Sequence, residues 1–234
     1  FIKKYGIKEE SLEKKIDDFS SFNDFFTRKL KPSARPISPR SNSIIAPSDG
    51  RVLVYNSISD TTPFFVKGEK LSISKLTRNP KFVKIFKNAG LAIIRLAPID
   101  CHRFCFPIDC EPQMTYLING SYLSVNPIAM KGSLKTFLEN KRMSTLLCTK
   151  TCGNILMVEI GGTCVGSIKQ TFSPFKKALK GQEKGYFEFG GSTVLLLFEH
   201  EKVKFADDIL ENTMNGIETY VLMGDSIATV AQNE

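Results

Sequence analysis

Four small residues near the C-terminal end of the chain, Gly190-Gly191-Ser192-Thr193, have the types and the order with which a protein can react with itself. The hydroxyl of Ser192 follows directly on the carbonyl of Gly191, and a glycine leaves that carbonyl open to attack by a neighbouring hydroxyl. Such an attack converts the peptide bond into an ester, and β-elimination of the ester then breaks the chain. Because a serine hydroxyl is a weak nucleophile, this chemistry needs a base beside it.

The chain contains only two histidines, the residue type that most often serves as such a base. His102 lies in the string Asp100-Cys101-His102-Arg103-Phe104-Cys105-Phe106-Pro107. His200 follows a continuous apolar run, where we expect an exposed turn. His102 is therefore the histidine that we expect to reach the serine, and a hydrogen-bonded structural histidine is the alternative.

Two predicted strands flank the glycine pair and would position it. Residues 186–189 are short and aromatic, and residues 194–198 form a continuous apolar run that is typical of a buried strand. Adjacent glycines between strands indicate a kink or a close approach of two backbones. From this pattern alone a bulged hairpin is the favoured interpretation, and a reactive serine is the second.

Length, composition and charge limit the class of protein. The 234 residues, 42% of them hydrophobic, predict a globular chain with a substantial core. No apolar run approaches the roughly 18 residues that a membrane-spanning helix needs. The net charge of +8 favours anionic partners such as acidic lipid surfaces, although charge alone fits a soluble basic protein equally well. We expect no nucleic-acid partner, because the basic residues are dispersed.

The six cysteines allow two interpretations. Cys101, Cys105 and Cys110 lie close to His102 in the sequence, so a zinc-stabilised binding module is one of them. The spacings are not those of common zinc modules, however, and no Cys-x-x-Cys pair occurs. We therefore expect no metal and predict reduced, partly buried thiols, as is usual in a long intracellular chain.

The N-terminal segment is predicted to be helical between Ile2 and Leu30, because apolar residues recur with helical spacing at Leu12, Ile16 and Phe19. A second helix start is expected at residues 20–24. The phenylalanines that follow would either dock on the protein's own core, which we favour, or lie on a membrane with basic residues at its anionic headgroups. Residues 31–47 are rich in proline and serine and are expected to connect this segment to the rest.

Phe189-Gly190-Gly191-Ser192-Thr193-Val194 resembles the self-cleavage site of the phosphatidylserine decarboxylases, and its Gly-Gly form is similar to that of the eukaryotic, type II members. Further matching strings occur in the family's order, at residues 21–32, 46–54, 95–107, 123–127, 161–168 and 216–228. The resemblance implies an α+β, β-rich fold. It would form a single domain over residues 1–234, with a helical segment and linker at 1–45. A barrel-sandwich-like catalytic core of short strands would follow at 46–234.

The resemblance also implies a function, the decarboxylation of phosphatidylserine to phosphatidylethanolamine. In this family the chain cuts itself between the residues that stand here as Gly191 and Ser192, and the serine becomes a covalent pyruvoyl cofactor, which acts as an electron sink. The predicted partners are phosphatidylserine in a membrane and the protein's own two cleaved chains, with a homodimer as an open arrangement. We expect a peripheral position on an intracellular membrane, mitochondrial or endomembrane. Because the chain begins with Phe1, any targeting segment is expected upstream of it.

The family's site residues carry over to Ser192, to His102 and to Asp49, which the resemblance makes the partner that orients the histidine. In isolation, Asp49 would be interpreted as the cap of a turn. Thr193 is a candidate auxiliary residue. The family's second histidine is Cys105 here, and a thiol acts as a base only when its pKa is lowered. This departure leaves an alternative, a catalytically impaired pseudoenzyme that binds anionic phospholipid.

Two further matches carry weaker predictions. Arg142, in the string at residues 137–142, would meet a phosphate or carboxylate or else form a surface salt bridge. Val165-Gly166-Ser167 is a second candidate cleavage site, ranked below Gly191 and Ser192 because only the latter stand where the family cuts.

Overall fold

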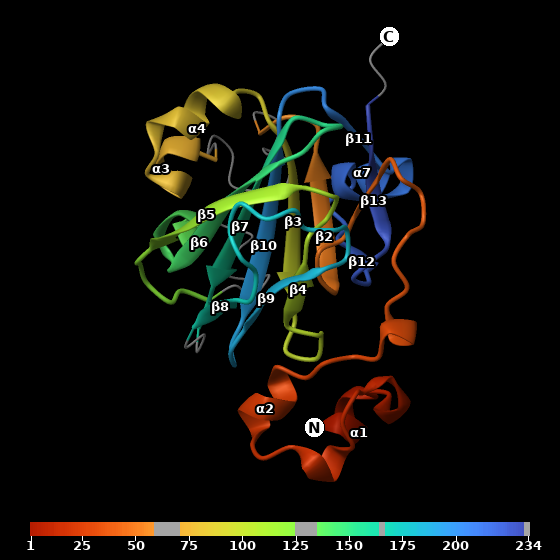
Figure 1. Ribbon diagram of the computed structural model, residues 1–234. Coiled ribbons are helices and arrows are strands. Elements are labelled where there is room, and N and C mark those ends of the chain that lie inside the picture. Colours follow the sequence, from red (N-terminus) through yellow and green to blue (C-terminus); the bar gives the residue numbers. More distant parts are fainter. Residues whose placement is uncertain (59–70, 125–134, 164–166, 232–234) are drawn as a thin grey trace.

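A seven-stranded antiparallel sheet carries the reactive serine in its central strand. The computed structural model describes residues 1–58, 71–124, 135–163 and 167–231. The strands of this sheet follow the order β12 (Thr219–Val221), β2 (Gly50–Tyr55), β3 (Gly90–Leu96), β10 (Ser192–Phe198), β7 (Asn154–Gly161), β6 (Arg142–Cys148) and β5 (Glu111–Ile118). Every residue of β10 is paired on both sides, with β3 and with β7 (Figure 1). The first residue of this doubly held strand is Ser192.

Two three-stranded sheets complete a sandwich. One has the order β4 (Arg103–Cys105), β9 (Glu183–Phe187) and β8 (Ile168–Gln170), and the other has the order β1 (Ser43–Ile45), β13 (Ser226–Val230) and β11 (Val203–Phe205). A hydrophobic core fills the space between them and the large sheet, with Val194 and Leu196 of β10 contributing to it. The intervening Leu195 and Leu197 point into a second core. Burial on both faces explains why β10 is apolar throughout.

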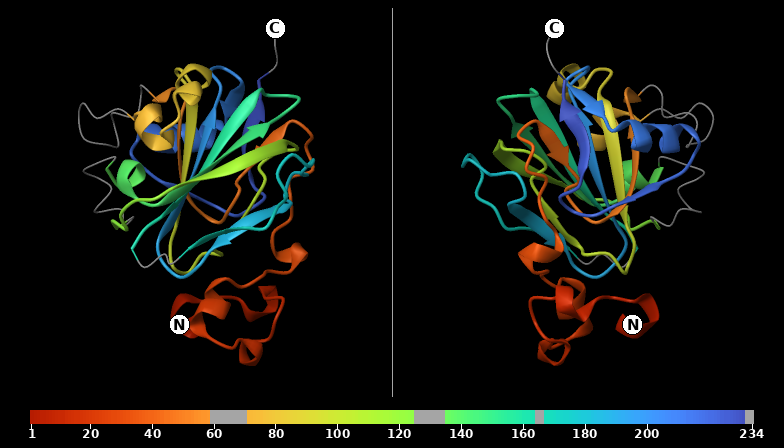
Figure 2. Two further views of the ribbon diagram at one scale, coloured as in Figure 1. Left: turned by 60° about the vertical axis from the view of Figure 1, so that its left-hand side comes forward. Right: turned by 90° about the vertical axis from the view of Figure 1, so that its right-hand side faces the viewer.

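Short helices cover the second core and one edge of the large sheet. Helices α3 (Ile73–Thr77), α4 (Pro80–Ile85) and α6 (Lys135–Glu139) pack on the second core. The longest helix of the described residues, α7 (Asp207–Met214), lies against β2 (Figure 2). There the Thr213 hydroxyl accepts a hydrogen bond of 3.1 Å from the Val54 amide. The described residues contain no helix long and apolar enough to cross a bilayer.

A buried ion pair ties the smaller sheet to the larger one. Lys184 Nζ of β9 lies 2.8 Å from the carboxylate of Glu159 on β7, and both side chains are fully buried. Gln170 hydrogen-bonds to both partners. Burial lowers the pKa of Lys184 and raises the pKa of Glu159, and each charge opposes the shift of the other.

The predicted helix over residues 2–30 is wrong. The segment instead contains α1 (Ile2–Tyr5), α2 (Phe22–Phe26) and single 3-10 turns at Glu9–Ser11 and Ile16–Asp18, below the sheets in Figure 1. Leu12 is buried and forms an antiparallel β-bridge with Leu30. Residues so far apart in a single helix could not pair in this way. The helix start at residues 20–24 is confirmed, since the Ser21 hydroxyl accepts a hydrogen bond from the Asp24 amide.

The expectation of a bulged hairpin around the glycine pair is also wrong. Strands β9 and β10 belong to different sheets, so residues 188–191 carry the chain from one layer of the sandwich to the other. Gly190 has a φ of 146°, a conformation that residues with a Cβ rarely adopt. The β-rich α+β class and the sandwich of short strands are confirmed, whereas the single-domain boundaries stay a prediction.

Candidate active site

The reactive pair predicted from the sequence is in contact. Ser192 Oγ lies 2.9 Å from Nδ1 of His102, and both side chains are fully buried. Ser192 shares the face of β10 with Val194, so its hydroxyl points into the first core toward the segment between β3 and β4, which carries His102. His200, in contrast, is exposed in a turn, as expected.

The second nitrogen of His102 fixes its tautomer. Nε2 lies 3.0 Å from the carbonyl oxygen of Ala97. Because a carbonyl only accepts hydrogen bonds, Nε2 must carry the proton, and Nδ1 is left as an acceptor for the Ser192 hydroxyl. Burial lowers the pKa of His102 to about 3, so the ring is neutral at physiological pH. The arrangement is that of a neutral base ready to take the proton of a serine.

The aromatic side chains of α2 close the site. The ring of Phe26 packs on His102 with a centroid separation of 3.9 Å, and it also meets the ring of Phe189 at 5.1 Å. Phe22 also contacts the ring of Phe189, and the Asn23 side chain accepts a hydrogen bond from the Phe189 amide. The preference for docking on the protein's own core is thus confirmed for Phe26. No sequence signal indicated that its partner would be the base itself.

Gly191 is held by the segment that follows β7. The Gly162 amide donates a hydrogen bond of 2.7 Å to the Gly191 carbonyl, and the Gly191 amide donates one of 3.2 Å to the carbonyl of Thr163. The carbonyl that Ser192 would attack is therefore fixed from one side by a backbone N–H.

Asp49 lies near the site. It was expected to orient the His102 ring, but the group that accepts the hydrogen bond from His102 Nε2 is the Ala97 carbonyl. Both carboxylate oxygens of Asp49 bind Arg35, at 2.6 and 2.5 Å. The same carboxylate accepts hydrogen bonds from the amides of Met223 and of Cys101, which precedes His102 in the chain. In this geometry Asp49 contacts the backbone beside the histidine, and its catalytic role stays a prediction.

The two auxiliary candidates have different surroundings. Cys105 is buried, and its burial raises the thiol pKa to about 12, opposite to the shift that a base requires. Thr193 lies on the other face of β10 from Ser192 and is fully buried, and its hydroxyl has no hydrogen-bond partner among the residues that the structure describes. Neither side chain shares the contact between Ser192 and His102.

The surroundings of Arg142 contradict both predictions for it, contact with a phosphate or carboxylate and a surface salt bridge. Its side chain is fully buried, and its guanidinium donates to the backbone carbonyls of Lys75, Leu76 and Asn140. It thus ties β6 to helix α3 over the second core. In the second candidate cleavage site, Val165 and Gly166 lie outside the described residues. Within the described ranges, no three His, Cys, Asp or Glu side chains are grouped so as to hold a metal ion.

A search of known families matches residues 22–229 of the chain to the model described as phosphatidylserine decarboxylase. The chain belongs to this family, whose members are lyases. A relative named phosphatidylserine decarboxylase proenzyme, from Chlamydia pneumoniae, is 47% identical over 234 residues, which is all of this chain and 78% of the relative. Proteins of the same name from Clostridium botulinum and Desulfitobacterium hafniense are each 46% identical, over 98% and 97% of this chain and 77% and 76% of their own.

These three relatives of the phosphatidylserine decarboxylase family are bacterial, so they do not bear on the type II grouping that the Gly-Gly pair suggested. Their shared name, proenzyme, describes proteins that are processed before they act. The family match spans helix α2, His102 and the glycine pair. All parts of the site described above therefore fall within the matched region.

Proposed function

We propose that this chain is a self-processing phosphatidylserine decarboxylase, which cuts itself between Gly191 and Ser192 and converts phosphatidylserine to phosphatidylethanolamine. One observation carries the proposal, the contact of 2.9 Å between the Ser192 hydroxyl and the unprotonated nitrogen of a neutral His102. A nucleophile, its base and a group that orients the base are the parts that covalent catalysis requires.

In the proposed cleavage His102 Nδ1 takes the hydroxyl proton while Ser192 Oγ attacks the carbonyl carbon of Gly191. The bond from this carbon to the Ser192 nitrogen breaks, and the nitrogen receives the proton, which leaves an ester. Removal of the Ser192 Cα proton then breaks the Cβ–Oγ bond, and Gly191 departs as a carboxylate that keeps Oγ. The dehydroalanine left on residue 192 takes up water and releases ammonia, which yields the pyruvoyl group.

The site fits this group. Residue 192 is fully buried at the first position of a strand held on both sides, so its new N-terminus would stay beside His102 after the cut. The pyruvoyl group supplies the electron sink for decarboxylation. His102 would deliver the proton that replaces carbon dioxide, and Phe26 would exclude water. The small chain, Ser192–Glu234, would remain bound through the two cores that β10 joins, with no need for a disulfide.

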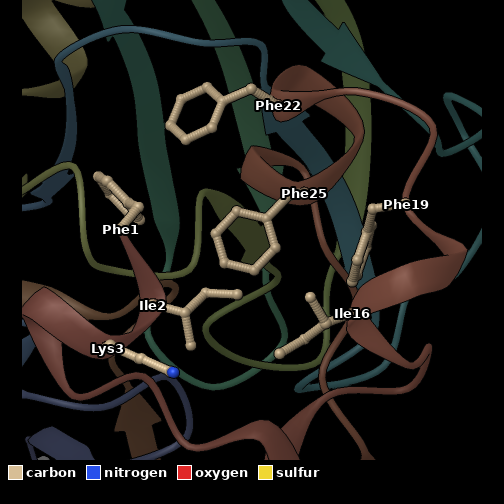
Figure 3. A pocket seen from close by; sticks show the side chains of 7 residues that line it. All are labelled: Phe1, Ile2, Lys3, Ile16, Phe19, Phe22 and Phe25. Carbon is tan, nitrogen blue, oxygen red and sulfur yellow. The ribbon is translucent and has the colours of Figure 1, made fainter.

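An aromatic surface beside the site supports a peripheral position on a membrane. Phe1, Phe22 and Phe25 line a cavity of about 310 Å³ together with Ile2, Lys3, Ile16 and Phe19 (Figure 3). Phe1 and Phe22 are 44% and 45% exposed, as side chains at a membrane interface would be. Ring contacts lead from Phe22 through Phe189 and Phe26 to His102. Apolar chains of a lipid would thus meet an apolar surface that ends at the base.

Decarboxylation is tested with purified protein and vesicles that contain phosphatidylserine, by measuring carbon dioxide and phosphatidylethanolamine. We expect both products from the wild type and neither from Ser192→Ala, which lacks the nucleophile. If an uncut wild-type chain binds anionic vesicles without turnover, the proposal is overturned and the pseudoenzyme alternative takes its place.

Membrane contact is tested separately by sedimentation with the same vesicles. Phe22→Ser should reduce the bound fraction, whereas Tyr116→Ser, which changes a somewhat more exposed aromatic residue on β5, should not. Equal loss of binding in both variants would contradict the assignment of the surface. The mass of the protein in solution tests the homodimer that the resemblance left open.

A further inference from the structure

The segment after β7 departs from regular strand pairing at the residue whose carbonyl is attacked. Ser192 pairs with Gly161 in the β7–β10 ladder. At the next position, Gly162 and Thr163 both lie opposite Gly191. The Gly191 carbonyl accepts a hydrogen bond from the Gly162 amide, while the Gly191 amide donates one to the Thr163 carbonyl. This is the pattern of a β-bulge, in which one extra residue redirects the backbone groups on that side. The result is that the Gly162 N–H is directed at the Gly191 oxygen at 2.7 Å.

The attack by Ser192 places a negative charge on this oxygen. A backbone N–H already directed at the position stabilises the charge without any rearrangement, and it does so more strongly in a buried site than in water. His102 is neutral before the reaction and lies against the Ser192 hydroxyl. Its role is therefore to accept the hydroxyl proton, and another group must stabilise the oxyanion. Among the described residues, the Gly162 amide is the donor to the Gly191 carbonyl.

The donor and the base come from different neighbours of β10. Gly162 directly follows β7, and His102 lies between β3 and β4. Strands β3 and β7 flank β10 and pair with every residue from Ser192 to Phe198. The registers of these two ladders therefore set the positions of both groups relative to the scissile bond.

We propose that the Gly162 amide is the oxyanion donor of self-cleavage, an inference that rests on the function proposed above. As Oγ bonds to the Gly191 carbon and His102 takes its proton, the carbonyl electron pair moves to the Gly191 oxygen and is held by the Gly162 N–H. The pair returns when the carbon–nitrogen bond breaks, and the proton passes from His102 to the Ser192 nitrogen. The donor neither gains nor loses a proton.

The test removes this one N–H. Replacing Gly162 by glycolic acid in cell-free synthesis puts an ester oxygen in place of the amide. The control puts the hydroxy acid analogue of glutamate at position 188, whose amide donates a hydrogen bond of 3.0 Å to Ser167 and does not touch the reacting carbonyl. The readout is the fraction of chain cut against time, measured by intact mass. The Gly162 ester should be cut on the order of 100-fold more slowly than the control ester.

Conventional variants and a stability measurement keep the test decisive. Gly162→Ala retains the N–H and should be cut much faster than Gly162→Pro, which lacks it. Thermal unfolding of the two esters in the uncut Ser192→Ala background should give similar midpoints, because each loses one backbone hydrogen bond. Equal cleavage rates for the two esters, or for the alanine and proline variants, overturn the inference alone. A wild-type chain that stays uncut overturns the proposed function and this inference with it.

Discussion

Because His102 is buried and neutral, the uncut protein should lose folding stability in acid. Replacing His102 should remove this part of the loss. The unfolded chain binds a proton at His102 below its ordinary pKa of 6.5, whereas the folded chain does so only near pH 3. Between these values the unfolded state holds more protons, so stability rises with pH. The stability that His102 permits is therefore fully present above about pH 6.5 and is lost as the pH falls.

The size of the effect follows from the pKa difference. At pH 5, about 1.5 pH units below the ordinary value, protonation of the unfolded state lowers the free energy of unfolding by about 2 kcal/mol. The folded state contributes almost nothing there, because its pKa of about 3 lies well below this pH. Other buried acids, such as Glu159 and Asp100, also titrate, but they do so with or without His102.

The assay compares two uncut proteins by urea unfolding near pH 7.5 and pH 5. Ser192→Ala keeps the histidine, and Ser192→Ala with His102→Gln lacks it. The single variant should lose about 2 kcal/mol more between the two pH values than the double variant. An equal loss in both would refute the reasoning, because His102 would then be solvated or charged in the folded state and could not be the neutral base described here.

Three further predictions concern other buried side chains. Cys105→Ser should be cut at the wild-type rate by intact mass, because the thiol pKa is raised to about 12; slow cleavage would give Cys105 a part in the chemistry. Lys184→Met should lower the free energy of unfolding by about 3–5 kcal/mol, since it strands the buried charge of Glu159. Adding Glu159→Leu should restore most of the lost free energy, as measured by urea unfolding. No recovery would contradict the view that the unpaired charge of Glu159 causes the loss. Phe26→Ala should raise the pKa of His102 toward 6.5 by admitting water, as NMR titration in the Ser192→Ala background would report, and an unchanged pKa would exclude Phe26 as the cover.

The contact between Ser192 and His102 could be predicted because each residue stands in a distinctive string and the chain offers few alternatives. The partner of His102 Nε2 could not. It is the backbone carbonyl of Ala97, and a carbonyl is present at every residue, so it leaves no signal in the sequence. Asp49 was predicted for that place, but Arg35, fourteen positions earlier, neutralises its carboxylate.

The sheets were easier to predict than the N-terminal segment. The apolar runs at β3, β7 and β10 are long, because each strand is buried on both faces. The predicted helix over residues 2–30 depended on three apolar residues at helical spacing, and Leu12 meets that spacing while its actual partner is Leu30. Arg142 shows the same limit, because burial among backbone carbonyls cannot be distinguished from a surface charge by residue type.

Self-cleavage is tested most directly by the intact mass of the purified wild-type chain under denaturing conditions. We expect two fragments split between Gly191 and Ser192. The smaller fragment, of 43 residues, should begin with a pyruvoyl group. Its mass should therefore be lower, by the mass of one ammonia, than that of the same fragment with an N-terminal serine. A single uncut chain of 26.2 kDa, from protein shown to be folded, would contradict self-cleavage by Ser192 and His102.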